Sequence, residues 1–264
     1  MKRNLVWIVL VFLILGCSLA FSQEQKQEQY LILFSLSGGT MYNGFTLSGD
    51  FLYNRKLEKW GIQAAETVNI NKNIHQSGFS AGAWRWFGSA VEVALFLDGL
   101  FLEGYAGFHA QIRPEFRIVL GKDLMVMGFF YAHPFTRDSF LEKMNPAAKA
   151  VRYFGFDSEI IFSESFKLKG DGIYSHSPFG KEDFFRLRFG GEFRACSWLT
   201  LSGEWLEFGA VDVLVSDIGG NYQVLKFSAT INLGRARKHR FSNFVEYDVF
   251  RPYYPAVITN CSLR

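Results

Sequence analysis

The stretch Glu103–Ile118, EGYAGFHAQIRPEFRI, sorts its residues into two sets by odd and even position. The odd positions are polar, aromatic or small, and they include Arg113, Glu115 and Arg117. The even positions are apolar or small. A period of two places the two sets on opposite faces of a β-strand. One face of this strand therefore carries charge, and the other meets an apolar environment.

Similar alternation recurs along the chain and divides it into long strands. In 184–195, for example, the charged face carries Arg186, Arg188, Glu192 and Arg194. Most of these segments exceed the roughly 9–11 residues with which a tilted strand crosses a membrane, and a strand of a soluble sheet averages only about 5–6. We therefore predict membrane-spanning strands at about 29–37, 43–54, 58–71, 77–87, 89–98, 102–119, 123–133, 150–163, 165–174, 183–195, 198–210 and 223–234.

The connections between these segments alternate between short and long. Tight turns are predicted at 55–57, 88, 121–122, 163–164 and 196–197, and longer connections at 134–149, 175–182 and 211–222. With the first strand starting in the periplasm, every tight turn falls on the periplasmic side, as in bacterial membrane barrels. The exception is Asp98–Phe101, which is predicted as an outer loop although it is short. Pro114 removes one ladder donor, which predicts a bulge or the exit of its strand from the membrane.

The N-terminus has the order of a secretory signal peptide. Lys2 and Arg3 precede an apolar run, 5–15, and small residues follow it. The run is shorter than the roughly 20 residues of a membrane-spanning helix. Ala20-Phe21-Ser22 fits a cleavage site, so we predict a signal peptide over 1–22. The alternative is a lipobox at 14–17 with Cys17 as the lipidated residue.

Composition excludes several other classes of protein. Hydrophobic residues make up 49% and aromatic residues 17%, which is too apolar for a disordered chain. The net charge of +3 gives no global indication of nucleic-acid binding. The histidines show no metal-ligand spacing, and we predict no metal and no cofactor. Cys196 and Cys261 remain after cleavage, and they form either one disulfide or two free thiols, both predicted on the periplasmic side.

From the two-sided strands 103–118 and 184–195, the chain resembles bacterial outer-membrane β-barrel proteins as a class. The resemblance covers about 29–234. It implies an all-β, antiparallel transmembrane β-barrel of about twelve strands, with 10 or 14 as alternatives. It also implies a location in the bacterial outer membrane, contact with outer-membrane lipid, insertion by the assembly machinery, and a monomer that binds no nucleic acid. The predicted domains are the signal peptide, a barrel over 23–234 and a periplasmic tail over 235–264 with a solvated basic run at 235–240.

The inward-facing set of charged residues is the candidate functional site. We predict that it lines a narrow porin-like channel for small polar or anionic solutes. The alternative is a surface structural barrel filled by ion pairs, because charges of both signs are nearly balanced. The predicted lining residues are Arg113, Glu115, Arg117, Asp157, Glu159, Arg186, Arg188, Glu192, Arg194, Glu204 and Lys226.

Two readings from other classes remain open. His75-Gln76-Ser77 looks like the catalytic pair of outer-membrane phospholipases and lipid A deacylases, with Glu103 as the nearest acid to orient the imidazole. The fuller motifs of those families are absent, so we predict a protein without enzymatic activity and keep the lipid hydrolase as an alternative. The other alternative is an exported soluble β-sandwich binding protein, in which the strands would bury the same alternating faces between two sheets.

Overall fold

The computed structural model describes residues 29–41, 44–57, 59–71, 75–88, 90–103, 107–121, 125–134, 148–150, 152–175, 184–209, 222–234, 249–253 and 257–259. The predicted signal peptide, Cys17 and the basic run 235–240 lie outside these residues. The strands are β1 (Gln29–Met41), β2 (Gly44–Leu57), β3 (Trp60–Asn71), β4 (His75–Phe87), β5 (Val91–Glu103), β6 (Gly107–Leu120), β7 (Met125–Pro134), β8 (Ala148–Ala150), β9 (Tyr153–Ile161), β10 (Phe166–Ser175), β11 (Phe184–Cys196), β12 (Leu199–Gly209), β13 (Tyr222–Gly234) and β14 (Val257–Thr259).

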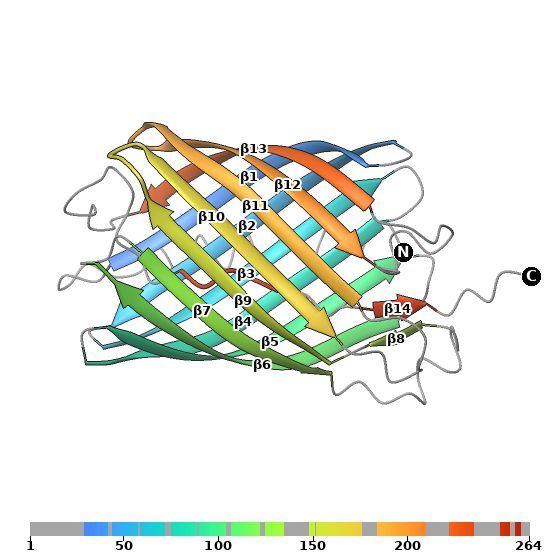
Figure 1. Ribbon diagram of the computed structural model, residues 1–264, viewed down its shortest axis with the longest axis horizontal. Helices are drawn as coiled ribbons and strands as arrows, with labels where there is room; N and C mark the ends of the chain where they lie inside the picture. The colour runs from blue at the N-terminus through green and yellow to red at the C-terminus, as the bar shows by residue number, and fades with distance from the viewer. Residues whose placement is uncertain are drawn as a thin grey trace, which may run out of the picture.

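Twelve of these strands form one closed antiparallel barrel (Figure 1), and this confirms the predicted fold class. Each strand pairs with its neighbour in sequence, with β7 and β9 adjacent because β8 lies outside the barrel. The barrel closes where β1 pairs with β13, from Leu31 opposite Gly234 to Thr40 opposite Leu225. Closure leaves no unpaired sheet edge, which is the condition that a bilayer imposes on β-structure.

One end of the barrel has only short connections. They join β2 to β3, β4 to β5, β6 to β7, β9 to β10 and β11 to β12, and this end also holds the start of β1 and the end of β13. Gly88 and Gly121 occupy two of these turns with φ of 71° and 62°, a region that favours glycine. We call this the tight-turn end and the other the long-loop end. At the long-loop end the connections after β1, β3 and β5 are short as well, so the predicted long connections occur only after β7, β10 and β12.

Two local predictions are wrong. Asp98–Phe101 is not a loop, because β5 continues to Glu103 and the next strand starts at Gly107. Glu103 therefore belongs to β5 rather than to the strand that follows. Pro114 causes neither a bulge nor an exit: β6 pairs with β7 in the same register on both sides of it, at Ile112 opposite His133 and at Glu115 opposite Phe130.

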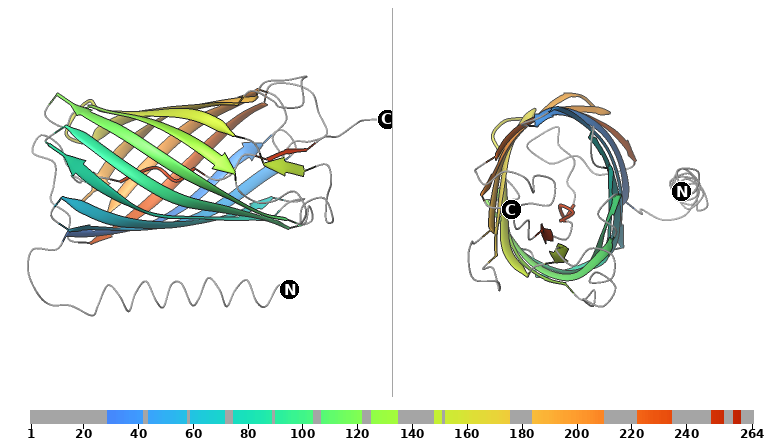
Figure 2. Two further views of the ribbon diagram at one scale, coloured as in Figure 1. Left: turned by 90° about the horizontal axis from the view of Figure 1, so that it is seen from below. Right: turned by 90° about the vertical axis from the view of Figure 1, so that its right-hand side faces the viewer.

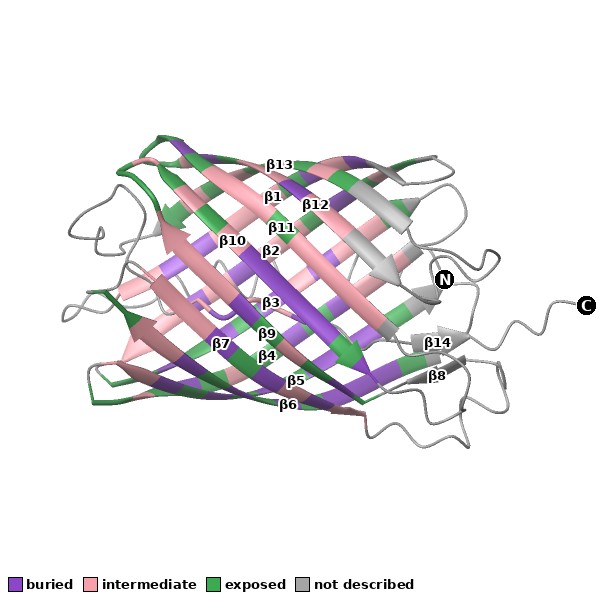
Figure 3. Cartoon of the chain, in the orientation of Figure 1, coloured by how far each residue is buried: buried purple, intermediate pink, exposed green. Residues whose placement is uncertain are grey.

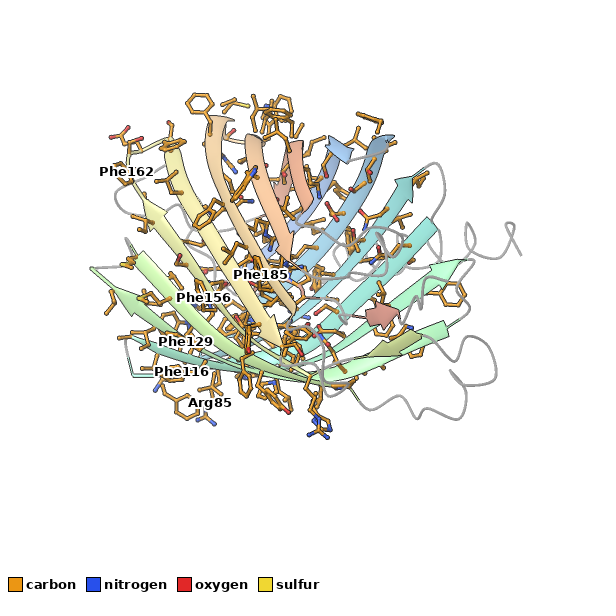
Figure 4. The ribbon with its side chains drawn as sticks, turned by 45° about the vertical axis from the view of Figure 1, so that its right-hand side comes forward. Arg85, Phe116, Phe129, Phe156, Phe162 and Phe185 are labelled. Carbon is orange, nitrogen blue, oxygen red and sulfur yellow. The ribbon has the colours of Figure 1, made fainter. Side chains whose placement is uncertain are left out.

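The outer surface of the barrel is apolar. Phe116, Phe129 and Phe156 lie opposite one another in register on β6, β7 and β9, and each is 40–47% exposed. Figure 4 shows these rings on the outside of the barrel, and Figure 3 shows exposed and buried positions alternating along the strands. The alternation therefore places aliphatic and aromatic side chains toward lipid and polar side chains toward the lumen.

The lumen contains part of the C-terminal segment. Phe250 and Tyr253 are 0% and 1% exposed, and Figure 2 shows residues 249–253 inside the ring of strands. Farther on, β14 pairs with β8 at the long-loop end, opposite to the end at which β13 finishes (Figure 1). The prediction that 235–264 extends away from the tight-turn end as a tail is therefore wrong for residues 249–253 and 257–259.

Candidate functional site in the barrel lumen

The structure places the predicted lining residues on the inner wall. Six of them are buried: Arg113, Glu115, Arg117, Asp157, Arg194 and Glu204. The other five are partly exposed: Glu159, Arg186, Arg188, Glu192 and Lys226. Most of the eleven belong to three clusters with different partners.

The first cluster centres on Arg113 of β6. Its Nε lies 2.8 Å from Asp98 Oδ2, and its Nη1 donates to Glu115. Asp98 also accepts from the Ser80 hydroxyl at 2.6 Å and from the Gln111 amide at 3.0 Å. All three charged side chains of this cluster are 0% exposed. An ion pair with this degree of burial depends on such hydrogen bonds to offset its desolvation.

The second cluster centres on Asp171 of β10. Its carboxylate accepts from Arg188 and from Arg251, and from Arg186 at 3.3 Å. Asp171 is fully buried, whereas Arg186 and Arg188 are 20% and 18% exposed. Arg251 comes from the C-terminal segment, so this cluster joins that segment to the wall.

The third cluster is a ladder of lysines and glutamates across β9–β12. Lys167 lies 3.0 Å from both Glu159 and Glu192, while Lys169 lies 2.8 Å from Glu192 and also pairs with Glu204. The pairs connect β10 with β9 and β11, and Lys169 reaches across β11 to Glu204 on β12. The ladder therefore holds this part of the wall together, and Arg188, 3.9 Å from Glu204, supplies a third positive charge for its three glutamates.

Farther round, the wall becomes less charged. Lys226 of β13 lies 3.8 Å from Asp50 of β2, with both side chains partly exposed. The Ser35 and Thr230 hydroxyls are 2.7 Å apart across the closing pair of strands. Near the tight-turn end, Arg194 donates to the Thr200 hydroxyl at 3.0 Å. This sector thus offers hydroxyl groups and one loosely spaced ion pair.

Side chains of the wall satisfy the backbone of residues 249–253. The Gln63 amide accepts from the Phe250 N–H at 2.8 Å and donates to the Phe250 carbonyl at 2.5 Å. Arg117 donates to the Val249 carbonyl and Gln111 to the Tyr253 carbonyl, each at 3.0 Å. Buried backbone groups outside secondary structure need such partners, and here the wall supplies them.

Aromatic and cationic groups receive the side chains of the same segment. The Phe250 ring lies 5.5 Å from Phe96, 6.3 Å from Trp84 and 4.5 Å from the Arg117 guanidinium. The Tyr253 ring lies 4.1 Å from Phe130, with Arg113 5.3 Å away and Arg186 5.6 Å away. These distances are those of aromatic and cation–π contacts.

Exposure divides the lumen into two sectors. On β5 and β6, beside residues 249–253, the polar groups Glu92, Asp98, Gln111, Arg113 and Glu115 are 0–2% exposed. On β9–β13 and β2, the ionised side chains of Glu159, Lys167, Arg186, Lys226 and Asp50 are 17–36% exposed. The first sector is dry and filled, and the second retains solvent-accessible space.

The other candidates from the sequence stand as follows. His75 pairs in backbone register with Glu103, and Ser77 with Phe101. Cys196 is an exposed free thiol near the tight-turn end, and Cys261 lies outside the described residues. In the part of the chain that the structure describes, no three His, Cys, Asp or Glu residues are grouped as metal ligands. Within the same residues, no helix is long and apolar enough to span a membrane.

Sequence reasoning missed several residues of the lumen. Asp98 was assigned to a loop, and Arg251 and Tyr253 to a periplasmic tail. Gln63, Trp84 and Phe96 carry no signal beyond their place in the even or odd series of a strand. For the tail, the signal was the clustering of aromatic residues around an arginine in 250–254, FRPYY, which is unusual for a segment that only meets water.

Comparisons with known proteins find the architecture but no family. No family model matches the chain, and no curated protein matches it. Solved structures do match. The NanC porin gives a TM-score of 0.56 at 8% identity over 76% of this chain and 100% of that chain. The chain is an outer-membrane β-barrel protein.

Two further structures have the same architecture. The KdgM porin gives a TM-score of 0.55 at 8% identity, over 75% of this chain and 98% of that chain. Outer membrane phospholipase A from Escherichia coli gives a TM-score of 0.50 at 8% identity, over 78% of this chain and 92% of that chain. At these identities the likeness is one of fold. With the apolar outer belt it confirms the predicted barrel and its place in the bacterial outer membrane.

Proposed function

We propose that this barrel is a narrow, porin-like channel that passes small polar solutes through its solvent-accessible sector, with a weak preference for anions. The partly exposed charges on β9–β13 and β2 carry this proposal, because ionised groups retain exposure only where water reaches them. Basic residues outnumber acidic ones by one on this wall: Lys56, Lys167, Lys169, Arg186, Arg188, Arg194 and Lys226 against Asp50, Asp157, Glu159, Asp171, Glu192 and Glu204. A surplus of one sign in a confined path raises the local concentration of the opposite ion.

The Lys226–Asp50 pair offers a direct test in planar bilayers. The two groups are 3.8 Å apart and partly exposed, so they face the path without holding the barrel together. Replacing Lys226 by Glu should shift the reversal potential in a salt gradient toward cation preference. Replacing Asp50 by Lys should shift it toward anions, and the swapped pair D50K/K226D should return it to the starting value.

Two results of this test would contradict the proposal. Folded wild-type protein that never conducts, at any loading, would leave the structural barrel as the function. Conductance whose selectivity ignores all three variants would place the path elsewhere. A boiled and an unboiled sample of each variant, compared by SDS gel mobility, serves as the control for folding.

We also propose that the barrel acts as a monomer in contact with outer-membrane lipid and enters the membrane through the assembly machinery. Its apolar outer belt supports the lipid contact, since Leu36, Leu95 and Phe227, on three strands, are 52–61% exposed. Native mass spectrometry from lipid nanodiscs tests the oligomeric state, and a two- or threefold mass would overturn this part.

The second candidate is a lipid hydrolase that uses His75 and Ser77, and one observation favours it. The backbone register pairs His75 with Glu103 and Ser77 with Phe101, so the three residue types of such a catalytic group occupy neighbouring register positions on two adjacent strands. The measurement is release of fatty acid from phospholipid and from lipid A in detergent micelles. Activity that Ser77→Ala abolishes would establish the hydrolase, and inactivity of the intact, folded protein would remove it.

A further inference from the structure

We propose that the dry sector of the lumen, together with Asp171 on the facing strand β10, is a built peptide-binding site, specific for an aromatic–arginine–proline–aromatic sequence and filled by Phe250-Arg251-Pro252-Tyr253 of the same chain. The bound segment closes this sector, and its release widens the channel. The proposal rests on the proposed channel function only for its electrical readout, because the site itself consists of contacts that exist whether or not solute passes.

Backbone recognition is the first argument. The Gln63 amide bonds both polar groups of Phe250, as a neighbouring strand would, and Arg117 and Gln111 take the carbonyls at either end of the segment. Three wall residues therefore satisfy the Phe250 N–H and the carbonyls of Val249, Phe250 and Tyr253.

Side-chain recognition is the second argument. Phe250 lies among Trp84, Phe96 and Arg117 on the β4–β6 wall, while Arg251 reaches Asp171 on β10. The segment therefore spans the lumen from one wall to the other. Asp171 is fully buried, and a buried carboxylate that meets three arginines is a site for a cationic side chain.

The direction of the segment explains what holds it in place. Val249 contacts Arg117, three residues from the tight-turn end of β6, and Tyr253 contacts Gln111, farther toward the long-loop end. The chain then reaches β14, which pairs with β8 in the long connection between β7 and β9. Residues 249–253 are thus fixed between β13 at one end and a two-stranded sheet at the other (Figure 2).

The test uses full-length protein in planar bilayers. The variant F250A/R251E removes the ring from the Phe96–Trp84 pocket and places a carboxylate against Asp171. We expect the ratio of open to closed time to rise by about a hundredfold, because truncating a buried Phe alone weakens binding by more than this factor. The matched control is R251K, which keeps a cation beside Asp171 and should gate like the wild type.

A synthetic peptide then tests the site itself. Acetyl-Val-Phe-Arg-Pro-Tyr-amide, added to the F250A/R251E barrel, should restore the closed level in proportion to its concentration. A peptide of the same composition in scrambled order should not. Unboiled SDS gel mobility of each variant confirms that the barrel is folded.

The outcomes separate this inference from the proposed function. A silent wild type with a conducting variant supports the plug and overturns the resting channel. A conducting wild type whose variant has the same conductance and open-time ratio overturns the plug and leaves the channel. A variant that opens but ignores the peptide overturns the claim of a sequence-specific site, and silence of both folded proteins overturns both proposals.

Discussion

Replacing Arg113 by Met should destabilise the barrel more than any other single change of an inner-wall arginine. The guanidinium is 0% exposed and pairs with both Asp98 and Glu115, which are equally buried. Methionine retains most of the apolar stem and its contact with the Phe96 ring, over which the guanidinium lies at 4.4 Å. The substitution therefore tests the charge and its hydrogen bonds rather than the loss of volume.

The magnitude follows from what is left behind. Removing one partner of a buried ion pair costs roughly 3–5 kcal/mol, because the other charge stays buried without compensation. Asp98 retains hydrogen bonds from Ser80 and Gln111, which lower the cost. Glu115 loses the ion pair that Arg113 makes with it. We therefore expect Arg113→Met to lower the free energy of unfolding by about 3–4 kcal/mol.

The assay is reversible urea unfolding in lipid vesicles, followed by tryptophan fluorescence and by gel mobility. Arg186→Met is the matched control, since Arg186 is 20% exposed and Asp171 keeps Arg188 and Arg251 after the substitution. We expect this variant to lose less than about 1 kcal/mol in free energy of unfolding. The double variant D98N/R113M should recover about 1–2 kcal/mol relative to R113M. A cost below about 1 kcal/mol for R113M, or no recovery in the double variant, would refute the reasoning.

Three further predictions concern the wall, the belt and the sidedness. A methyl group at Gly82 would meet the Leu95 carbonyl and the Phe96 ring, so Gly82→Ala should lower the free energy of unfolding by about 1–3 kcal/mol in the same urea assay. Gly49 has open space around it, so Gly49→Ala should change this free energy by no more than about 0.5 kcal/mol. Leu97→Arg, on the lipid face in the middle of β5, should lower the free energy of unfolding by about 2–4 kcal/mol. Leu120→Arg, at the tight-turn end of β6, should lower it by only about 0–1 kcal/mol. Equal losses would argue against the assigned depth of these residues in the membrane. An impermeant maleimide should label Cys196 in permeabilised envelopes but not in intact cells, because the tight-turn end is assigned to the periplasm. Labelling of intact cells would reverse this orientation.

The wall of the barrel could be predicted from the sequence because its physics is local. Each strand alternates between lipid and lumen with a period of two, so 184–195 identifies both faces without knowledge of its neighbours. The predicted strand starts fall within a few residues of those observed. The misplacement of Glu103 shows the limit of this approach. Odd positions face outward on β5 and inward on β6, but the small residues between the two strands hide this change of phase in the sequence.

The contents of the lumen could not be predicted in the same way. Whether Arg113 and Glu115 line water or pack against protein depends on a segment more than 130 residues away, and β6 has the same pattern in both cases. Charge balance did favour pairing, and pairs are what the structure contains at Asp98, Asp171 and Glu192. The third partner of Asp171, however, is Arg251, which no strand periodicity connects with β10.

The position of residues 249–253 also bears on how the inner wall is stabilised. Arg113 and Arg117 are in contact with both the acidic residues of the wall and the rings of Tyr253 and Phe250. The rings shield these ion pairs from water, and shielding strengthens a pair whose hydrogen bonds are already in place. Wall and segment therefore stabilise each other: the arginines hold the segment, and the segment keeps the arginines dry. Loosening either one should weaken the other, so we expect R113M to raise the fraction of time that the channel is open as well as to lower stability. R186M should have smaller effects on both, because Asp171 still pairs with Arg188 and Arg251.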